Sequence, residues 1–500
     1  MQNPFDVLII GAGLSGVGMA CHIQRDCPDQ RYAILERRSR IGGTWDLFRY
    51  PGIRSDSDMF TFGYAFRPWN SFKVLADGTS IREYVTETAK EYGVDRNIHY
   101  GVKIVRADFS TKTNLWTVHA LDEASGREQT YQSRVLVSCT GYYNYDKGFL
   151  PDFPGQERFK GTRVHPQFWP EGLDYKGKRV VVIGSGATAV TLVPAMADDA
   201  AHVTMLQRSP GFIFSVPGTD AIARTMSKFL PRKLVYAITR KRNLALLRAM
   251  YFGSLRWPEK ARKLLMDNVE KQVGDKVDMK HFTPRYNPWE ERLCAVPDGD
   301  LFKAIRKGRA SVVTAEIESF TEGGIKLKNG DELAADIVIT ATGLNLQVFG
   351  GVQISVDGKA IQPNDHLTYK ATLLEGVPNL AWIVGYTNAP WTLKADIASR
   401  YICRLLSHMK QHGYARFEAR APAGERDDDT IFGSLKSGYV MRAAQTLPRQ
   451  GKSLPWRVLH DYKRDQPMLL SDPIDDGFLS FEAAPADVAA KKPGKVAKAA

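Results

Sequence analysis

Short, continuous apolar runs alternate along this chain with segments whose apolar residues recur at helical spacing. Residues 5–10 (FDVLII) form one such run, and a helical pattern follows from residue 17. A second run, residues 179–183 (RVVVI), precedes another helical pattern through residue 190. Runs of this length that are rich in β-branched residues indicate parallel strands buried on both faces. The pattern therefore predicts an α/β fold in which a strand–turn–helix unit occurs twice.

A glycine-rich turn joins the first predicted strand to its helix. Its residues are Gly11, Ala12, Gly13, Leu14, Ser15 and Gly16. In a dinucleotide-binding turn the three glycines serve a tight turn, backbone approach to a pyrophosphate, and helix packing on the strand. The pyrophosphate then lies at the helix N-terminus. The next predicted strand, residues 32–35, ends in Glu36, whose carboxylate can accept a hydrogen bond from a ribose hydroxyl. A plain glycine turn would not require that acid, so we expect a dinucleotide here.

A second glycine-rich turn follows the second run. Its residues are Gly184, Ser185, Gly186, Ala187, Thr188 and Ala189, and alanine is an accepted variant in the last place. The strand predicted after it, residues 202–206, ends in Gln207 and Arg208, with no acid at the place of Glu36. An arginine there suits a 2′-phosphate, which a carboxylate would repel. We therefore predict FAD at the first turn and NADPH at the second.

Composition agrees with an enzyme that carries two nucleotides. The chain has 500 residues, 43% hydrophobic and 25% charged, as in a globular protein of two or three domains. The first predicted strand begins at residue 5, which leaves no room for a signal peptide, and no apolar run reaches the ~18 residues of a membrane span. The five cysteines show neither a C-x-x-C pair nor metal-ligand spacing, so we expect reduced packing residues, no metal and a cytoplasmic location. Disulfide reductases need a redox cysteine pair and are disfavoured.

The net charge of +13 is unevenly distributed. Residues 224–263 hold twelve Lys and Arg against one acid, Glu259, a local charge of +11. Apolar residues recur among them at helical spacing, which predicts a helical insertion at about residues 219–280. We expect a solvated face that raises the local potential for an anionic cofactor. Peripheral contact with anionic lipid is the alternative, and no motif suggests nucleic-acid binding.

Two further segments resemble a known family. Residues 159–170 (FKGTRVHPQFWP) fill every fixed position of the pattern Phe-x-Gly-x-x-x-His-x-x-x-Trp-Pro. Residues 42–56 fit a second pattern, Gly-Gly-x-Trp, four residues, Tyr-Pro-Gly, three residues, Asp. Both resemble type I Baeyer–Villiger monooxygenases, and the likeness is greatest to the ethionamide-activating subgroup. The sister family that oxidises nitrogen and sulfur carries Phe or Tyr in place of Trp169.

The resemblance implies how the chain is divided. Two strands that end in Thr-Gly, residues 134–141 and 336–343, resemble the points where these enzymes cross between domains. We expect an FAD domain in two parts, with an NADPH domain inserted between them. The parts are residues 1–145 (FAD), 146–339 (NADPH, with the helical insertion), 340–482 (FAD) and 483–500, a basic tail whose lack of core-forming side chains predicts disorder.

The resemblance also implies contacts for each cofactor. Those expected for FAD are Ser15, Glu36, Thr44, Trp45, Asp46, Leu47, Asp56 and Ile104. Those expected for NADPH are Arg54, Ser55, Asp56, residues 184–190, Gln207 and Arg208. Many relatives place lysine directly before the family's arginine, where it helps to bind the 2′-phosphate, but this chain has Glu291. We therefore expect the preference for NADPH to rest mainly on Arg208.

The family's chemistry requires a permanent cation in the active site. Reduced flavin reacts with O2 to a C4a-peroxyflavin, which must stay deprotonated to attack a ketone. By resemblance the cation is Arg292, in the sequence Arg-Leu-Cys, and Asp56 is the carboxylate that holds it. His165 and Trp169 are expected to couple domain motion to the chemistry.

These observations predict a Baeyer–Villiger monooxygenase that converts ketones to esters or lactones with O2. Two other hypotheses stay open. The first is oxygenation of sulfides or thioamides by the same peroxyflavin as the main role. The second is a non-catalytic nucleotide-binding redox sensor, for which the retention of Arg292 and Asp56 would have no explanation.

Overall fold

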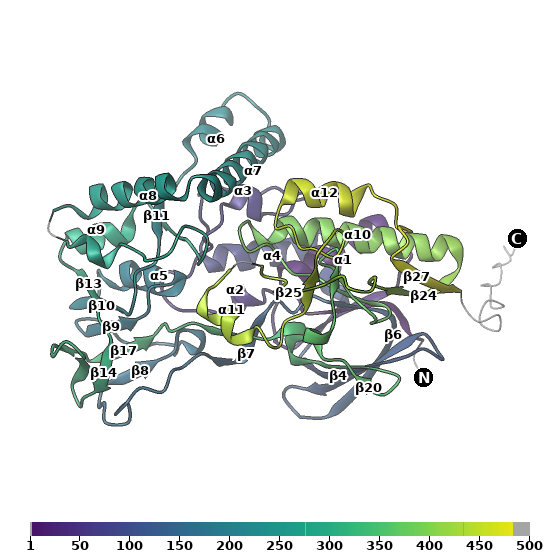
Figure 1. The fold of residues 1–500 in the computed structure, drawn as a ribbon, viewed down its shortest axis with the longest axis horizontal. Coiled ribbons are helices and arrows are strands. Elements are labelled where there is room, and N and C mark those ends of the chain that lie inside the picture. Colours follow the sequence, from purple (N-terminus) through teal and green to yellow (C-terminus); the bar gives the residue numbers. More distant parts are fainter. Residues whose placement is uncertain (1–2, 276, 434, 484–500) are drawn as a thin grey trace, which may run out of the picture.

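The strand–helix alternation folds into two large sheets that stand side by side (Figure 1). The computed structural model describes residues 3–275, 277–433 and 435–483. Within them, eleven strands make the first sheet, in the order β20-β19-β4-β5-β6-β1-β2-β3 with β21–β23 attached beside β6. Their bounds are β1 Phe5–Ile10, β2 Tyr32–Glu36, β3 Ile98–Tyr100, β4 Val102–Ser110, β5 Leu115–Asp122, β6 Glu128–Ser138, β19 Gln353–Val356, β20 Lys359–Ala360, β21 Thr368–Tyr369, β22 Leu373–Leu374 and β23 Leu380–Trp382.

Two kinds of pairing meet in this sheet. The continuous apolar run of β1 pairs in parallel with β2 and with the end of β6, so that Val7 lies opposite both Tyr32 and Val135. The first half of β6 instead pairs antiparallel with β5, and β5 with β4. One long strand thus joins a parallel dinucleotide-binding half to an antiparallel meander.

The second sheet is wholly parallel, in the order β13-β10-β9-β17-β8. Its strands are β8 Thr162–Val164, β9 Arg179–Ile183, β10 His202–Gln207, β13 Ala310–Thr314 and β17 Ile337–Thr340. Because both faces are covered, the strands carry continuous rather than alternating apolar residues. The predicted α/β fold with two Rossmann-like sheets is confirmed.

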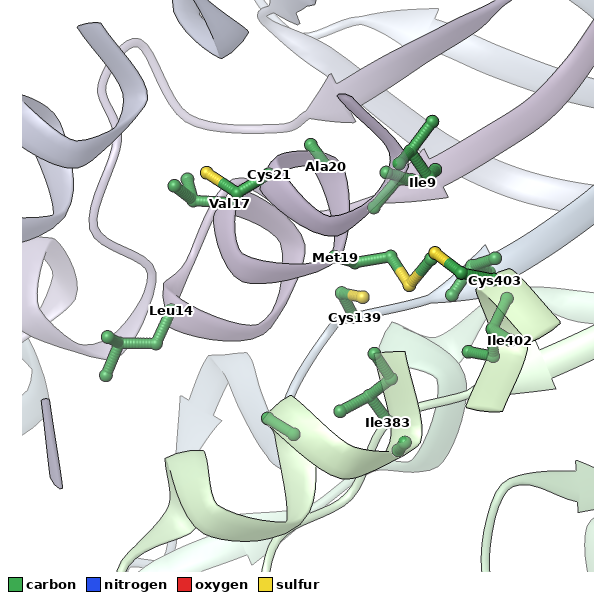
Figure 2. Close-up of a cluster of buried hydrophobic side chains, with 14 of the residues drawn as sticks. Ile9, Leu14, Val17, Met19, Ala20, Cys21, Cys139, Ile383, Ile402 and Cys403 are labelled. Atoms are coloured by element: carbon green, nitrogen blue, oxygen red, sulfur yellow. The ribbon is translucent and has the colours of Figure 1, made fainter. Parts of the chain in front are cut away.

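Helices cover both sheets. On the first, α1 (Leu14–Asp26) packs against β1 and against α10 (Trp391–His412), and Figure 2 shows Met19, Cys139, Ile383 and Cys403 gathered where α1 and α10 meet. All five cysteines are buried and free. The other helices of these layers are α2 Thr44–Leu47, α3 Met59–Phe62, α4 Gly78–Glu91, α5 Ala187–Met196, α9 Asp300–Arg306, α11 Gly438–Ala443 and α12 Tyr462–Leu470. In the described part of the chain, none of the helices has the length and apolar character needed to cross a membrane.

Two antiparallel segments, β7 (Tyr143–Gly148) and β18 (Leu344–Leu346), connect the sheets. The domain boundaries near residues 145 and 340 stay a prediction; residue 145 lies in β7 and residue 340 ends β17. Smaller sheets complete the fold. Three have two strands each: β11 Ile213–Val216 with β12 Cys294–Pro297, β24 Tyr414–Ala419 with β27 Leu479–Ala483, and β25 Arg426–Thr430 with β26 Arg449–Gly451. One has three strands: β14 Ile317–Phe320, β15 Gly324–Leu327 and β16 Glu332–Ala334. Apart from Ala483, the predicted disordered tail lies outside the described residues.

The basic segment forms α6 (Ala221–Met226), α7 (Arg232–Arg256) and α8 (Pro258–Val273). Figure 1 shows α6 and the adjoining end of α7 standing out from the rest of the molecule at the top of the view. The inner side of α7 contacts α3, which belongs to the first-sheet part of the chain. Although it is inserted between strands of the second sheet, this helix therefore also rests on the first.

Candidate functional site

A cleft of about 1460 Å³ lies between the two sheets, and both glycine turns line it. Most of the residues expected to bind cofactors face this one cavity. They are Gly11, Gly13, Ser15, Glu36, Thr44, Trp45, Arg54, Ser55, Asp56, Ile104, Gly184, Ser185, Gly186, Ala187, Thr188 and Arg208. Residues from remote parts of the sequence thus meet at the carboxyl ends of the parallel strands, where open α/β sheets bind ligands.

The first turn needs its glycines for distinct steric reasons. Gly11 has a φ of +98°, and a Cβ there would lie 2.9 Å from the carbonyl oxygen of Cys139. A Cβ on Gly16 would lie 1.8 Å from the oxygen of Gly11, so Gly16 serves the packing of α1 and does not line the cleft. A Cβ on Gly13 would have Cα of Gly43 as its nearest neighbour, at 3.5 Å. That open backbone at the start of α1 fits a pyrophosphate.

Glu36 ends β2 and is buried against the turn. Its Oε2 accepts a hydrogen bond from the Ala12 amide at 2.6 Å, and its Oε1 accepts one from the Arg38 amide at 2.8 Å. Burial raises the pKa of this carboxyl, while the two amides act in the opposite direction. A carboxylate fixed at the strand end in this way has lone pairs left for a ribose hydroxyl.

The second turn repeats the arrangement on β9 and α5. Gly184 has a φ of +137°, and a Cβ there would lie 2.3 Å from the carbonyl oxygen of Ala341. At Gly186 a Cβ would meet no atom within 4 Å, so the backbone is open to the cleft. Arg208 is exposed on the cleft wall just after β10. Glu291 lines the same wall, where burial raises its pKa and the charge of Arg208 lowers it.

Several expected contact residues lie behind the cleft wall. Besides Gly16 they are Asp46, Leu47, Ala189 and Gln207. Asp46 is buried within reach of four arginines, Arg38, Arg40, Arg49 and Arg82. Gln207 donates from Nε2 to the carbonyl oxygen of His281 and to Thr314 Oγ1. These side chains shape the wall from behind.

Arg54 faces the cleft but has a protein partner. Its Nη1 lies 2.6 Å from Oδ2 of Asp300, at the start of α9. The pair joins the first-sheet part of the chain to the second-sheet part across the cleft. Arg54, an expected NADPH contact, therefore also links the first-sheet part of the chain to the second-sheet part.

Arg292 reaches the cleft just before β12. Its Nε donates to the hydroxyl of Tyr439 at 3.0 Å, and its Nη1 donates to the carbonyl oxygen of Thr387. Both partners belong to the C-terminal part of the chain, so the guanidinium of one half is positioned by the other. Burial opposes the charge, but Tyr439, Tyr142 and, last, Asp56 more than offset this, and the pKa of Arg292 is raised.

Asp56 differs from the expectation that it would hold Arg292 directly. It is exposed on the cleft wall and, within the described chain, makes no ion pair with the arginine. Tyr439 in α11, which no motif indicated, contacts the guanidinium of Arg292 instead. It is separated from Arg292 by 147 residues, and nothing in the local sequence around it marks the contact.

Aromatic residues line the same region. Trp391 begins α10 and donates from Nε1 to Ser15 Oγ at 2.8 Å. Tyr142 stacks on Trp391 with ring centroids 5.1 Å apart, and its hydroxyl lies 2.9 Å from that of Tyr143. A flat ring system would find stacking partners here, beside the first glycine turn and within the same cleft as Arg292.

Two dinucleotide turns that open onto one cleft, with a permanently charged arginine on its wall, define an oxidoreductase of the two-dinucleotide class. The family "Flavin-binding monooxygenase-like" matches residues 5–359. This chain belongs to that family and is a flavin-dependent monooxygenase, as the sequence patterns predicted.

Relatives match over nearly the whole chain. MymA of Mycobacterium tuberculosis H37Rv is 58% identical over 494 residues, 98% of this chain and 100% of that protein. The FAD-containing monooxygenase EthA of the same strain is 50% identical over 490 residues, again 98% and 100%. Among solved structures, an oxidized steroid monooxygenase bound to NADP superposes with a TM-score of 0.78 at 20% identity, covering 96% of this chain and 100% of that one. An open cyclohexanone monooxygenase gives 0.77 at 18% identity with the same coverage. The two structures show that the fold is shared.

Proposed function

We propose that this enzyme inserts one oxygen atom of O2 next to the carbonyl of a ketone, giving an ester or lactone, with FAD at the first glycine turn and NADPH at the second. NADPH supplies two electrons, O2 gives one atom to the product and the other to water, and one proton is consumed. Bound FAD supplies the activation of O2. The relatives named for FAD and the neighbour bound to NADP support this cofactor pair.

The placement of Arg292 carries the proposal. Oxygen insertion builds negative charge on the carbonyl oxygen of the ketone, and a fixed cation at that point lowers the barrier. Arginine keeps its charge at any working pH, and Tyr439 and Thr387 hold the guanidinium so that it needs no reorganisation during reaction. Sulfur oxygenation builds no such oxyanion on its substrate, so it does not require this arrangement.

The residues around the cofactors have positioning roles in this proposal. Glu36 would accept from the ribose of FAD, and the amides of the first turn would face its pyrophosphate. Arg208 would contact the 2′-phosphate of NADPH. Trp391 and Tyr142 would pack beside the flavin ring and exclude water from it.

The test is product analysis on purified holoenzyme with NADPH, O2 and a panel of linear, cyclic and aryl ketones plus one thioether. Esters or lactones are expected from at least one ketone class. In Arg292→Ala we expect FAD to remain bound and NADPH still to reduce it, while ester formation falls at least ~100-fold, the scale seen when one oxyanion stabiliser is lost. Arg292→Lys is the matched variant, because it keeps the charge but loses the planar fork that reaches both partners.

Each alternative has its own signature. Sulfoxide formation with no ester from any ketone would make heteroatom oxygenation the main reaction. NADPH oxidation that never yields an oxygenated product would favour the redox-sensor hypothesis. Normal ketone turnover in Arg292→Ala would remove this residue from the mechanism.

A further inference from the structure

Large apolar side chains are unusually exposed on the helical insertion. Of the fifteen large apolar residues that are exposed in the described chain, ten lie between residues 222 and 264. They are Ile222, Phe229, Leu234, Ile238, Leu246, Met250, Phe252, Leu255, Trp257 and Leu264. Isolated exposed leucines are ordinary in a folded protein, but such a concentration on one projecting element marks an interaction site.

The most exposed of these side chains lies where α6 meets α7. Phe229 in the connecting loop is 79% exposed, Ile222 in α6 59% and Leu234 in the first turn of α7 47%. Leu234 and Ile238, which recur at helical spacing, are both exposed. Val235, Tyr236, Thr239 and Arg240 are buried in their place.

The same surface carries cations without acidic partners. Several of the twelve Lys and Arg residues are engaged, such as Arg242 with Asp220 and Arg248 with Asp461. Others are exposed and, among the described residues, pair with no carboxylate. These are Arg224, Lys228, Lys233, Lys241, Arg256 and Lys260. Three of them, Arg224, Lys228 and Lys233, alternate with Ile222, Phe229 and Leu234 along residues 222–234, which we call the α6–α7 tip.

The tip is held in an ordered position. Asp220 caps α6 by accepting from the Ala223 amide at 2.9 Å, and the same carboxylate pairs with Arg242 of α7. Farther along, Arg240 of α7 donates to the carbonyl oxygens of Phe60, Thr61 and Gly63. The apolar side chains of the tip are therefore presented outward by a fixed scaffold.

We propose that the α6–α7 tip is a docking surface for anionic phospholipid membranes. Apolar side chains interleaved with unpaired cations match the two layers that a peripheral protein meets at such a membrane: acyl chains below and phosphate groups above. Charge complementarity selects this occupant over a second copy of the chain, because two copies meeting at this surface would bring their unpaired cations together. The cations also have no acid on the tip to neutralise them.

The helix α7 runs from the tip toward the chain segment that precedes Arg292. Near the far end of that helix, the ring of Tyr251 packs edge-on against Trp289 with centroids 5.3 Å apart. Trp289 lies three residues before Arg292.

Vesicle flotation of the FAD-loaded enzyme tests the proposal, with phosphatidylcholine vesicles that contain or lack phosphatidylglycerol. The wild type should float with the phosphatidylglycerol vesicles and detach as salt is added. The variant Arg224→Gln/Lys228→Gln/Lys233→Gln should bind on the order of 100-fold more weakly. The variant Ile222→Ser/Phe229→Ser/Leu234→Ser keeps the charge and should bind at least about tenfold more weakly, because it loses the inserted side chains.

The matched control removes three exposed lysines elsewhere, Lys112→Gln/Lys307→Gln/Lys359→Gln, so that the net charge falls equally. It should bind like the wild type, and all variants should keep the wild-type flavin spectrum and melting temperature. Failure of the wild type to float overturns the proposal, as does equal weakening by the tip and control charge variants.

Light scattering on the same samples addresses the competing occupant. If the serine variant changes the oligomeric state and floats as well as the wild type does, the tip is a contact between copies of this chain and the proposal is wrong. An unchanged oligomeric state together with lost flotation supports it.

Discussion

Single residues decide the cofactor chemistry, and the wall that holds Arg208 and Glu291 is the most informative example. The second glycine turn, the end of the strand that follows it and Arg208 were all predictable from the sequence. The closeness of Glu291 to Arg208, 83 positions away, was implied only by the family resemblance, because no local pattern joins the two residues. Glu291 is half-buried beside the place proposed for a 2′-phosphate, and this burial raises the pKa of its carboxyl.

We therefore predict a moderate preference of the wild type for NADPH over NADH. A charge-assisted pair contributes about 1.5–3 kcal/mol, or roughly 10- to 150-fold in kcat/KM. Arg208→Ala should nearly abolish the preference and Glu291→Lys should strengthen it. Measuring kcat/KM for both cofactors in the three proteins checks this. Arg309→Ala, an exposed arginine paired with Asp198 away from the cleft, is the control and should keep the wild-type ratio. Equal use of the two cofactors by the wild type would contradict the assignment of Arg208.

At the scale of elements, the strands and turns that hold the cofactors were predictable and the contacts between them were not. The predicted strands at residues 5–10, 179–183 and 202–206 match β1, β9 and β10, because continuous β-branched runs have few other folded solutions. The direction in which α7 faces was not predictable. Val235 and Tyr236 are buried on the side where Arg240 donates to backbone carbonyl oxygens, while Leu234 and Ile238 are exposed.

Among the site residues, too, those in local patterns were predictable and those brought in by distant contacts were not. Glu36 and the glycines are found from local patterns, because a strand, a glycine turn, a helix and an acid follow one another in the sequence. Tyr439 and Trp391 reach Arg292 and Ser15 from 147 and 376 residues away, and such contacts leave no local signal. Asp56, inferred by resemblance, shows that a matching motif position does not by itself fix a contact.

The connection between the sheets yields a prediction at this scale. His165 of the family pattern packs its ring on Gly148 of β7, where a Cβ would lie 2.1 Å from Cε1 of the ring. Gly148→Ala should therefore destabilise the protein by about 1–3 kcal/mol, as overpacking does, and slow flavin reduction by NADPH. The measurements are thermal unfolding and single-turnover reduction.

A second substitution makes that test specific. Gly148→Ala/His165→Ala should be no less stable than His165→Ala alone, because the clash has been removed. Gly323→Ala, where a Cβ meets no atom within 4 Å, is the control and should change neither quantity. If the stability losses of the two single variants add up in the double variant, the ring of His165 is not the reason that residue 148 must be glycine.

For the molecule as a whole, the function depends on residues of one half that are fixed by the other. Arg292 is held by Thr387 and Tyr439, Arg54 by Asp300, and α7 by α3 through Arg240. The two sheets are thus joined by polar contacts across the cleft as well as by β7 and β18. The cleft is therefore assembled from both halves of the chain.

Arg240 gives the sharpest test of that coupling. Its guanidinium is buried without a carboxylate partner among the described residues, and its Nη1 donates to Phe60 O at 2.8 Å, Thr61 O at 3.1 Å and Gly63 O at 2.9 Å. Arg240→Gln would leave buried carbonyl groups unpaired, a loss of roughly 3–5 kcal/mol because several charge-assisted bonds disappear together. The neighbour Lys241 is exposed and pairs with no carboxylate in the described chain, so Lys241→Gln removes the same charge without loss of stability. Thermal unfolding should separate the two variants clearly, and limited trypsin digestion should cut within residues 224–263 faster only in Arg240→Gln. Equal stability and equal digestion of both variants would mean that α7 is held by its apolar contacts alone.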